Sequence, residues 1–301
     1  MTSQADMIIE RRRVRRRLAM WRIGAIVAIV VAVVALLPKF SSPVRDHIAR
    51  VTVDGIIFAD DKRVAAIRSI AGNDSAKALI VHVNSPGGAV VPSEDLYDAI
   101  REVAAVKPVV ATMSEYAASG GYITAIAADR IYARANTLTG SIGVYMEAPN
   151  IAGLLDTIGV EVTRVKSAPL KGEPSLSSPP SPEALQVQQQ LIADTYGWFK
   201  DLVGERRGLA GGALDQVSDG RAFTGRQAVE LDLVDAIGGE AAARAWLAEE
   251  HAISEDLSVR EAKWRDSELP WPFDDLERGA ASIAQIEQLI GAVPRLYAII
   301  R

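Results

Sequence analysis

Residues 81–89 read VHVNSPGGA, in which an apolar run ends in a turn of small residues before a helical pattern begins. A second turn of this kind, SEYAASGGY, occupies residues 114–122 and follows the apolar run 108–112. Apolar runs of this length that end at Gly, Ser or Pro are typical of buried strands. We therefore expect both turns to open at one edge of the same sheet.

The order of the segments around these turns predicts an α/β fold. Strand-like runs at 48–53, 78–83, 108–112 and 130–134 alternate with helix-like segments at 61–71, 92–104 and 120–128. Such alternation favours βαβ units and a mostly parallel sheet, which binds ligands beyond the carboxyl ends of its strands.

In the second half of the chain the predicted helices and strands no longer alternate regularly. We expect a helix at 151–158, a strand at 160–165, and a loop at 167–182 that is rich in Pro and Ser. A long amphipathic helix should begin at Pro182 and end near Gly208, and a last helix should cover 240–250.

The amino terminus has the pattern of a membrane anchor. Six arginines between positions 11 and 17 precede an apolar run at 23–37, which extends back to Leu18 to give 20 residues. A helix of that length spans roughly 30 Å, about the thickness of a bilayer core. The positive-inside rule then keeps the arginines in the cytoplasm and places everything after Pro38 on the extracytoplasmic, periplasmic side of the inner or plasma membrane. A cleaved signal peptide is the alternative, although no small-x-small cleavage site follows Leu37.

Composition restricts the chemistry. The chain has 301 residues, of which 49% are hydrophobic and 24% charged, so it can bury a core. It contains no cysteine, which excludes disulfides, thiolate ligands and a cysteine nucleophile. Residues 1–22 carry a net charge of +5 and the remainder −10, which argues against nucleic-acid binding by the body. No metal-ligand spacing is present, and we expect neither a metal nor a cofactor.

The two glycine turns together favour an acyl-transfer site. Gly87 and Gly88 let the backbone approach a substrate and can offer N–H groups as an oxyanion hole. Ser119 lies near the start of a predicted helix, where unpaired N–H groups favour developing negative charge. Ser85 is a rival nucleophile, but its position before Pro and two glycines is typical of a turn former.

Five segments in this order resemble the short form of the bacterial signal peptide peptidase A family. They are NSPGG at 84–88, YAASGGY at 116–122, TGSIGV at 139–144, KSAPLKGEPS at 166–175 and FTGRQAVELDLVDAIGG at 223–239. The resemblance covers roughly residues 48–250 and implies the crotonase-like fold of the Clp protease proteolytic subunit. It implies Ser119 as nucleophile, Lys171 as general base, Ser141 as a hydroxyl that orients the lysine, and the backbone of Gly87 and Gly88 as the oxyanion hole.

Residue chemistry agrees with a Ser-Lys dyad. A serine hydroxyl needs an adjacent base, and a lysine amine serves only when it is neutral, so Lys171 should lie in a dry, mostly apolar cleft. The three histidines, His47, His82 and His251, do not suit a triad, although His82 precedes the first glycine turn and could approach the site. Glu115 departs from the family pattern and leaves subsite preference open, whereas Ala168, where family members often have Gly, affects loop flexibility more than chemistry.

These observations predict a membrane-anchored serine endopeptidase that degrades apolar peptides such as cleaved signal peptides. We divide the chain into a cytoplasmic basic segment (1–17), a transmembrane anchor (18–38), a linker (39–47), a protease domain (48–252) and a carboxyl-terminal extension without an assigned role (253–301). The resemblance also implies a ring-shaped homo-oligomer in which the serine of one copy meets the lysine of its neighbour. A crotonase-like acyl-CoA enzyme and a catalytically silent membrane scaffold remain as alternatives. The extension could pack on the domain, contact the membrane or lie in the cleft as a self-inhibiting peptide.

Overall fold

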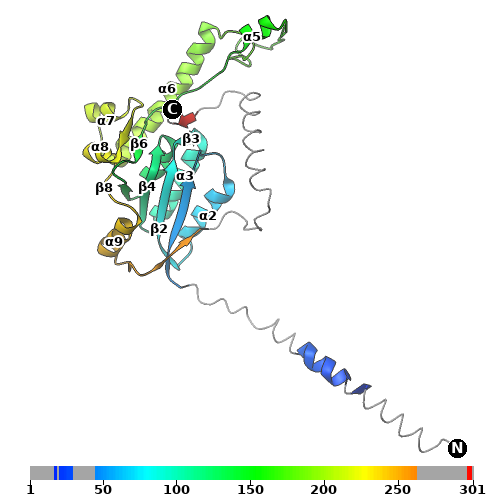
Figure 1. Cartoon of the computed structure of the whole chain (residues 1–301), viewed down its shortest axis with the longest axis vertical. Coiled ribbons are helices and arrows are strands. Elements are labelled where there is room, and N and C mark those ends of the chain that lie inside the picture. The colour runs from blue at the N-terminus through cyan, green and yellow to red at the C-terminus, as the bar shows by residue number, and fades with distance from the viewer. Residues whose placement is uncertain (1–16, 19, 30–44, 263–296, 300–301) are drawn as a thin grey trace, which may run out of the picture. The chain divides into compact units, whose positions relative to one another are not determined.

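The computed structural model describes residues 17–18, 20–29, 45–262 and 297–299, and it divides into the units Met1–Arg45 and Asp46–Arg301 (Figure 1). In the first unit, residues 17–18 and 20–29 are helical. Within the described part of the chain, no helix combines the length and the apolar character that crossing a bilayer requires. Residues 19 and 30–38 of the predicted anchor lie outside the described residues.

The second unit is built on a mostly parallel sheet, as the alternating segments predicted. Its strands run in the order β7 (Ala222–Thr224), β6 (Leu138–Gly140), β4 (Val109–Ala118), β2 (Ala76–Ser85), β1 (His47–Asp54) and β9 (Ser258–Glu261). A branch adds β5 (Arg130–Ala133), which pairs with β4, and β8 (Ala236–Ile237), which pairs with β5. All of these pairs are parallel except β6 with β7, so the α/β prediction is confirmed.

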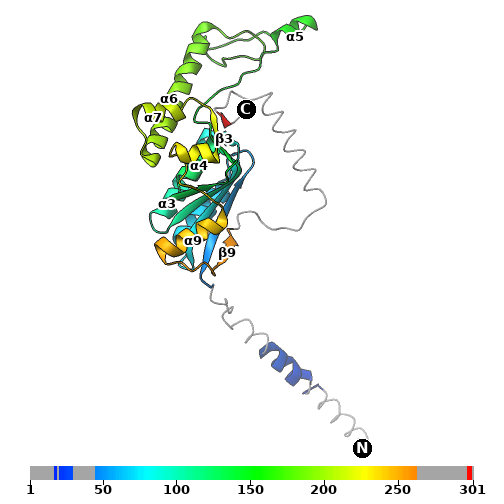
Figure 2. The same cartoon turned by 60° about the vertical axis from the view of Figure 1, so that its left-hand side comes forward.

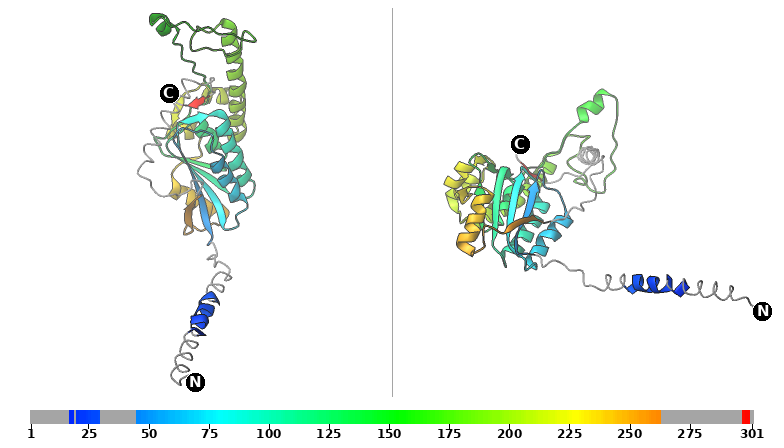
Figure 3. Two further views of the ribbon diagram at one scale, coloured as in Figure 1. Left: turned by 90° about the vertical axis from the view of Figure 1, so that its right-hand side faces the viewer. Right: turned by 60° about the horizontal axis from the view of Figure 1, so that its bottom comes forward.

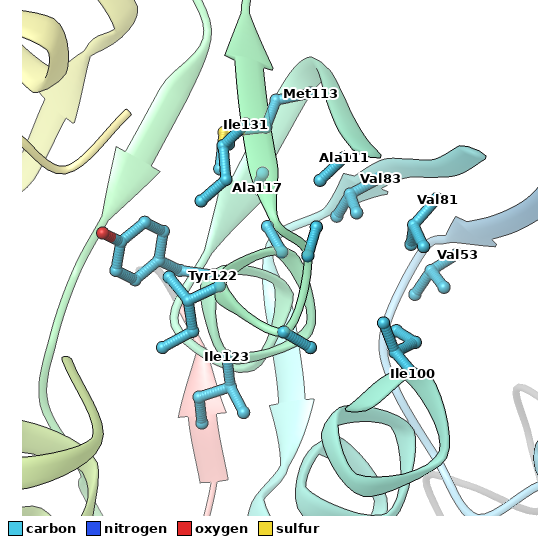
Figure 4. Packing of buried hydrophobic residues seen from close by; sticks show 14 of the residues in the cluster. Val53, Val81, Val83, Ile100, Ala111, Met113, Ala117, Tyr122, Ile123 and Ile131 are labelled. Atoms are coloured by element: carbon cyan, nitrogen blue, oxygen red, sulfur yellow. The ribbon is translucent and has the colours of Figure 1, made fainter. Parts of the chain in front are cut away.

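Both faces of the sheet are covered, which explains why its strands are apolar throughout. Side chains alternate between the faces: Leu79 and Val81 of β2 belong to one buried cluster, and Ile80 belongs to the other. The larger cluster includes side chains from α2 (Asp61–Ala71), α3 (Val90–Ala104), α4 (Gly120–Ile126) and α6 (Pro182–Arg207), and Figure 4 shows part of it. The smaller cluster includes α9 (Glu240–His251), so the sheet lies between α9 and the pair α2 and α3 (Figure 3).

Local signals set the helix boundaries. The Asp60 side chain accepts the Arg63 N–H at 3.0 Å and starts α2. Ser181 accepts the Ala184 N–H at 3.1 Å, Pro182 occupies the first turn, and α6 ends at Gly208 in the left-handed conformation. The predicted bounds of these two helices are therefore confirmed. Two short helices, α7 (Gly211–Val217) and α8 (Gly225–Glu230), lie between α6 and α9.

One predicted strand is wrong. Residues 160–165 form no strand, and the Val165 side chain is 97% exposed. These residues follow the short helix α5 (Ala152–Thr157), and no described strand lies beside them to complete a ladder. No element of the described part of the chain covers the alternating apolar side chains of these residues.

The carboxyl-terminal extension contributes two strands. β9 pairs in parallel with β1 at the edge of the main sheet. β10 (Tyr297–Ile299) pairs with β3 (Gly87–Ala89) in a separate two-stranded sheet. Neither pairing was predicted, because the resemblance ends near residue 250.

Candidate active site

Ser119 occupies the sharp turn between β4 and α4. Its backbone has φ 54° and ψ −117°, a left-handed conformation that an L-residue adopts at a cost of about 1–3 kcal/mol. Two hydrogen bonds hold this turn: the Ser119 N–H donates to the Gly140 carbonyl at 2.8 Å, and the Ser119 carbonyl accepts from the Ile123 N–H at 2.9 Å. Strained strand-to-helix turns also present the nucleophilic serine of α/β-hydrolases.

The Ser119 side chain is buried without a partner. Only 1% of the residue is exposed, and its Oγ has no hydrogen-bond partner among the described residues. A buried hydroxyl normally pairs, because leaving it unpaired costs about 1–3 kcal/mol. A buried, unpaired hydroxyl at a strained turn is the usual mark of a functional group rather than of a structural one.

The first glycine turn lies on the neighbouring strand β2. The Gly87 N–H donates to the Ser85 Oγ at 3.1 Å, so Ser85 acts as a turn former with a buried, occupied hydroxyl. The Ile57 N–H donates to the Gly87 carbonyl and the Ala89 N–H donates to the Ile57 carbonyl, both at 2.9 Å. Because N–H and C=O groups alternate in direction along a strand, the Gly88 groups face away from Ile57. Of the two N–H groups predicted for the oxyanion hole, that of Gly88 is therefore the one left available by these contacts.

Glycine contacts bring the two turns together. A Cβ atom on Gly120 would lie 3.2 Å from the Gly88 nitrogen and 2.3 Å from the Ser93 Oγ. A Cβ atom on Gly121 would lie 2.7 Å from the Ser85 carbonyl oxygen. Only glycine permits this approach, so the start of α4 packs directly on the turn that contains Gly88. Both turns thus lie at the carboxyl ends of adjacent parallel strands, as predicted.

Ser141 lies beside the same end of the sheet. β6 pairs with β4 so that Gly140 is opposite Ala118, and Ser141 is the next residue. Ser141 is buried, with φ 50°, and its N–H donates to the Arg221 carbonyl at 2.9 Å. The structure therefore places Ser141 one residue beyond the carbonyl that holds the Ser119 N–H.

Lys171 is not brought to Ser119 within one chain. Residues 159–172 are exposed, and they belong to a segment that leaves the sheet together with α5 and the start of α6 (Figure 2). Within the single chain Lys171 does not lie in the dry cleft that was expected, because no element among the described residues covers this segment. The same segment exposes large apolar side chains, such as Leu154 at 59%.

His82 is a structural residue. Its Nδ1 lies 3.1 Å from the Thr112 Oγ1 on the adjacent strand β4. Burial is the main cause that lowers the pKa of His82 below its usual value, which favours the neutral ring. This cross-strand contact accounts for the histidine without a catalytic role.

The sequence did not lead us to predict the contacts of two residues near the turns, Asn84 and Ser93. The Asn84 Oδ1 accepts the Glu115 N–H at 3.2 Å and ties the end of β2 to β4 where the register between the two strands shifts. Ser93 is fully buried, donates to the Ala89 carbonyl at 2.9 Å and packs against Gly120. Asn84 lies within the NSPGG segment, where its position at a strand end was a usable signal; nothing local distinguished Ser93.

Comparison with known proteins identifies the family. The model of peptidase family S49 matches residues 101–254. A Synechocystis protein provisionally named a protease is 39% identical over 211 residues, which cover 69% of this chain and 76% of that protein. An Enterococcus faecium protein provisionally named signal peptide peptidase SppA is 36% identical over 176 residues, which cover 57% of this chain and half of that protein.

A ClpP1 variant from Listeria monocytogenes is among the structures that match, with a TM-score of 0.42 and 16% sequence identity over 63% of this chain and 91% of that one. The sequence resemblance to signal peptide peptidases is confirmed by the family match and the relatives. The chain belongs to peptidase family S49.

Proposed function

We propose that this protein is a serine endopeptidase in which Ser119 is the nucleophile and Lys171 the general base. The observation that carries the proposal is the Ser119 hydroxyl, which is buried in a strained turn without a partner among the described residues. The close approach of Gly120 to the Gly88 nitrogen supports a substrate carbonyl bound beside that hydroxyl. Membership of a peptidase family sets the reaction class.

The proposed reaction has two stages. The Lys171 amine accepts the Ser119 hydroxyl proton while Oγ bonds to the carbonyl carbon of the peptide. The Gly88 N–H, with Gly87 shaping the turn, stabilises the oxyanion, and the lysine then gives its proton to the departing amine as the C–N bond breaks. Water then attacks the resulting ester as Lys171 accepts its proton, and Lys171 gives that proton to the Ser119 Oγ as the C–O bond breaks, which releases the acid and restores Ser119 and the free amine. The Ser141 hydroxyl orients the lysine amine.

The base comes from a neighbouring copy in this proposal. Lys171 is exposed on a segment that leaves its own sheet, whereas Ser119 is buried and its hydroxyl has no partner among the described residues. A head-to-tail assembly that closes by symmetry would cover the exposed apolar residues of this segment and bring Lys171 to the next copy's Ser119. Leu185 and Leu191 of α6 are about half exposed, at 52% and 47%, and extend the apolar surface available for such a contact.

The proposed substrates are apolar peptides such as cleaved signal peptides. The name of the Enterococcus relative and the motif resemblance support this class. The arginine-flanked apolar run supports an uncleaved anchor over residues 18–38, which would hold a Clp-like catalytic domain on the extracytoplasmic side of the membrane.

Covalent labelling and point variants test the dyad. A fluorophosphonate should modify Ser119, and the adduct can be located by peptide mass spectrometry. Ser119→Ala and Lys171→Ala should each lower kcat for an apolar peptide by about 10⁴-fold or more, because the members of a catalytic unit act together. Lys166→Ala is the matched control: Lys166 is in the same segment but pairs with Glu173, so this variant should keep activity within a few-fold. An adduct elsewhere, or normal turnover without Lys171, would refute the dyad.

A mixing experiment tests the shared site. Inactive Ser119→Ala and Lys171→Ala proteins are combined under conditions in which subunits exchange. Some interfaces then pair an intact serine with an intact lysine, so part of the activity should return. A mixture that stays inactive after exchange is demonstrated by mass-tagged subunits would show that each copy builds its own dyad.

A further inference from the structure

The carboxyl-terminal strand of the chain lies against the glycine turn of the candidate site. β10 pairs with β3 in antiparallel register, with Tyr297 opposite Ala89, Ala298 opposite Gly88, and Ile299 opposite Gly87. β3 contains Gly88, whose N–H is the proposed oxyanion donor. A strand from the far end of the sequence therefore occupies the edge at which a substrate peptide would have to bind.

The hydrogen bonds of β3 show which of its edges is used. The Ile57 N–H donates to the Gly87 carbonyl, and the Ala89 N–H donates to the Ile57 carbonyl, each at 2.9 Å. The backbone groups on that edge of β3 are therefore occupied. The groups of Gly88 face the opposite edge, where Ala298 lies directly across. The start of α4 approaches the same nitrogen, since a Cβ on Gly120 would be 3.2 Å from it. A strand paired at this edge thus lies at the glycine turn on which Gly120, the residue after Ser119, packs.

We propose that residues 297–299 occupy the substrate strand position and make the protein self-inhibited. This inference rests on the proposed function, because it takes the β3 edge to be the peptide site. Extended peptides bind exposed strand edges through main-chain hydrogen bonds, and the YAI sequence is of the apolar class proposed for the substrate. Because the strand is tethered to the domain, its effective concentration at the β3 edge is on the order of millimolar. It can therefore suppress the binding of a free peptide without a high intrinsic affinity.

Peptide binding measures the competition without requiring catalysis. The probe is a fluorescein-labelled peptide of residues 293–301, VPRLYAIIR, and its Kd is measured by fluorescence anisotropy on full-chain Ser119→Ala protein in detergent. Removing residues 297–301 from that protein should tighten binding at least about tenfold. Ala298→Pro in the full chain should have the same effect, because proline has no N–H to donate to β3. Ala298→Ser keeps the N–H and is the matched control, so its Kd should equal that of the full chain. Equal Kd values for the full and shortened chains would overturn the proposal.

Hydrogen exchange gives a second readout at β3 itself. The amides of residues 87–89 should exchange at least about tenfold faster in the shortened chain and in Ala298→Pro than in the full chain. Unchanged exchange in both variants would refute the pairing in solution.

Hydrolysis by the shortened chain with Ser119 intact separates this inference from the proposed function. If the Kd falls on shortening and no peptide is cleaved, the occupied edge stands and the peptidase proposal fails. If peptides are cleaved equally with and without residues 297–301, self-inhibition fails and the peptidase proposal stands.

Discussion

Replacing Ser119 by glycine should stabilise the protein while it abolishes activity. The residue has φ 54° and ψ −117°, which glycine adopts without strain and an L-residue adopts at a cost of about 1–3 kcal/mol. Glycine loses more backbone entropy on folding, about 0.5–1 kcal/mol relative to alanine. Taking the midpoints of these two ranges, Ser119→Gly should be more stable than Ser119→Ala by about 1 kcal/mol. Both variants lack the hydroxyl, so the difference between them isolates the backbone term.

Urea unfolding of the two full-chain variants measures this difference, with thermal unfolding as a second assay. At about 2–4 °C per kcal/mol for chains of this size, the Tm of Ser119→Gly should exceed that of Ser119→Ala by roughly 2–4 °C. Ala65→Gly provides a control of opposite sign, because Ala65 is exposed in the regular helix α2 and glycine there should cost about 1 kcal/mol. If Ser119→Gly is no more stable than Ser119→Ala, then Ser119 is unstrained and the argument that its conformation is maintained for function fails.

Three other expectations concern the close packing, the buried tyrosine and the membrane topology. Gly120→Ala should cost about 1–3 kcal/mol of unfolding free energy, because its Cβ would lie 2.3 Å from the Ser93 Oγ. Adding Ser93→Ala to this variant should recover about 1 kcal/mol. Strictly additive effects of the two substitutions in urea unfolding would contradict this expectation. Burial raises the pKa of Tyr122 well above the usual value of a tyrosine, and its hydroxyl donates to the Leu233 carbonyl. Above about pH 10 the folded chain therefore keeps a proton that the unfolded chain loses, so the free energy of unfolding should fall as the pH rises. The fall should be less steep in Tyr122→Phe, and an equally steep fall in that variant would assign the loss to other groups. Reporter enzymes fused after Pro38 and at the carboxyl terminus should both read as exported, and cytoplasmic activity of the second would refute the proposed location.

Short-range patterns predicted most of the fold because their causes are local. The helix at 61–71 matches α2 at both ends, since Asp60 caps its start within the same few residues. The apolar run at 78–83 lies within β2 and the run at 108–112 enters β4 at Val109, because strands buried on both faces are apolar throughout. The meeting of the two glycine turns also followed, since carboxyl ends of neighbouring parallel strands share one edge.

Features that depend on a distant or separate partner were not predicted correctly. The alternation at 160–165 indicated a strand, but a strand exists only where another strand completes its ladder, and none does so here among the described residues. Lys171 was expected in a dry cleft, yet burial depends on what covers a residue, and the single chain leaves this segment exposed.

The sequence by itself determined an α/β domain, its glycine turns and the candidate serine, because periodicity, capping and turn chemistry act within a few residues. Tertiary structure alone decided that Ser119 is strained and its hydroxyl unpaired within the described part of the chain, that the Gly87 N–H is taken by Ser85, and that β10 lies against β3. These features arise from contacts between segments that are remote in the chain or from backbone angles that those contacts impose. Residue type and local spacing carry no record of either.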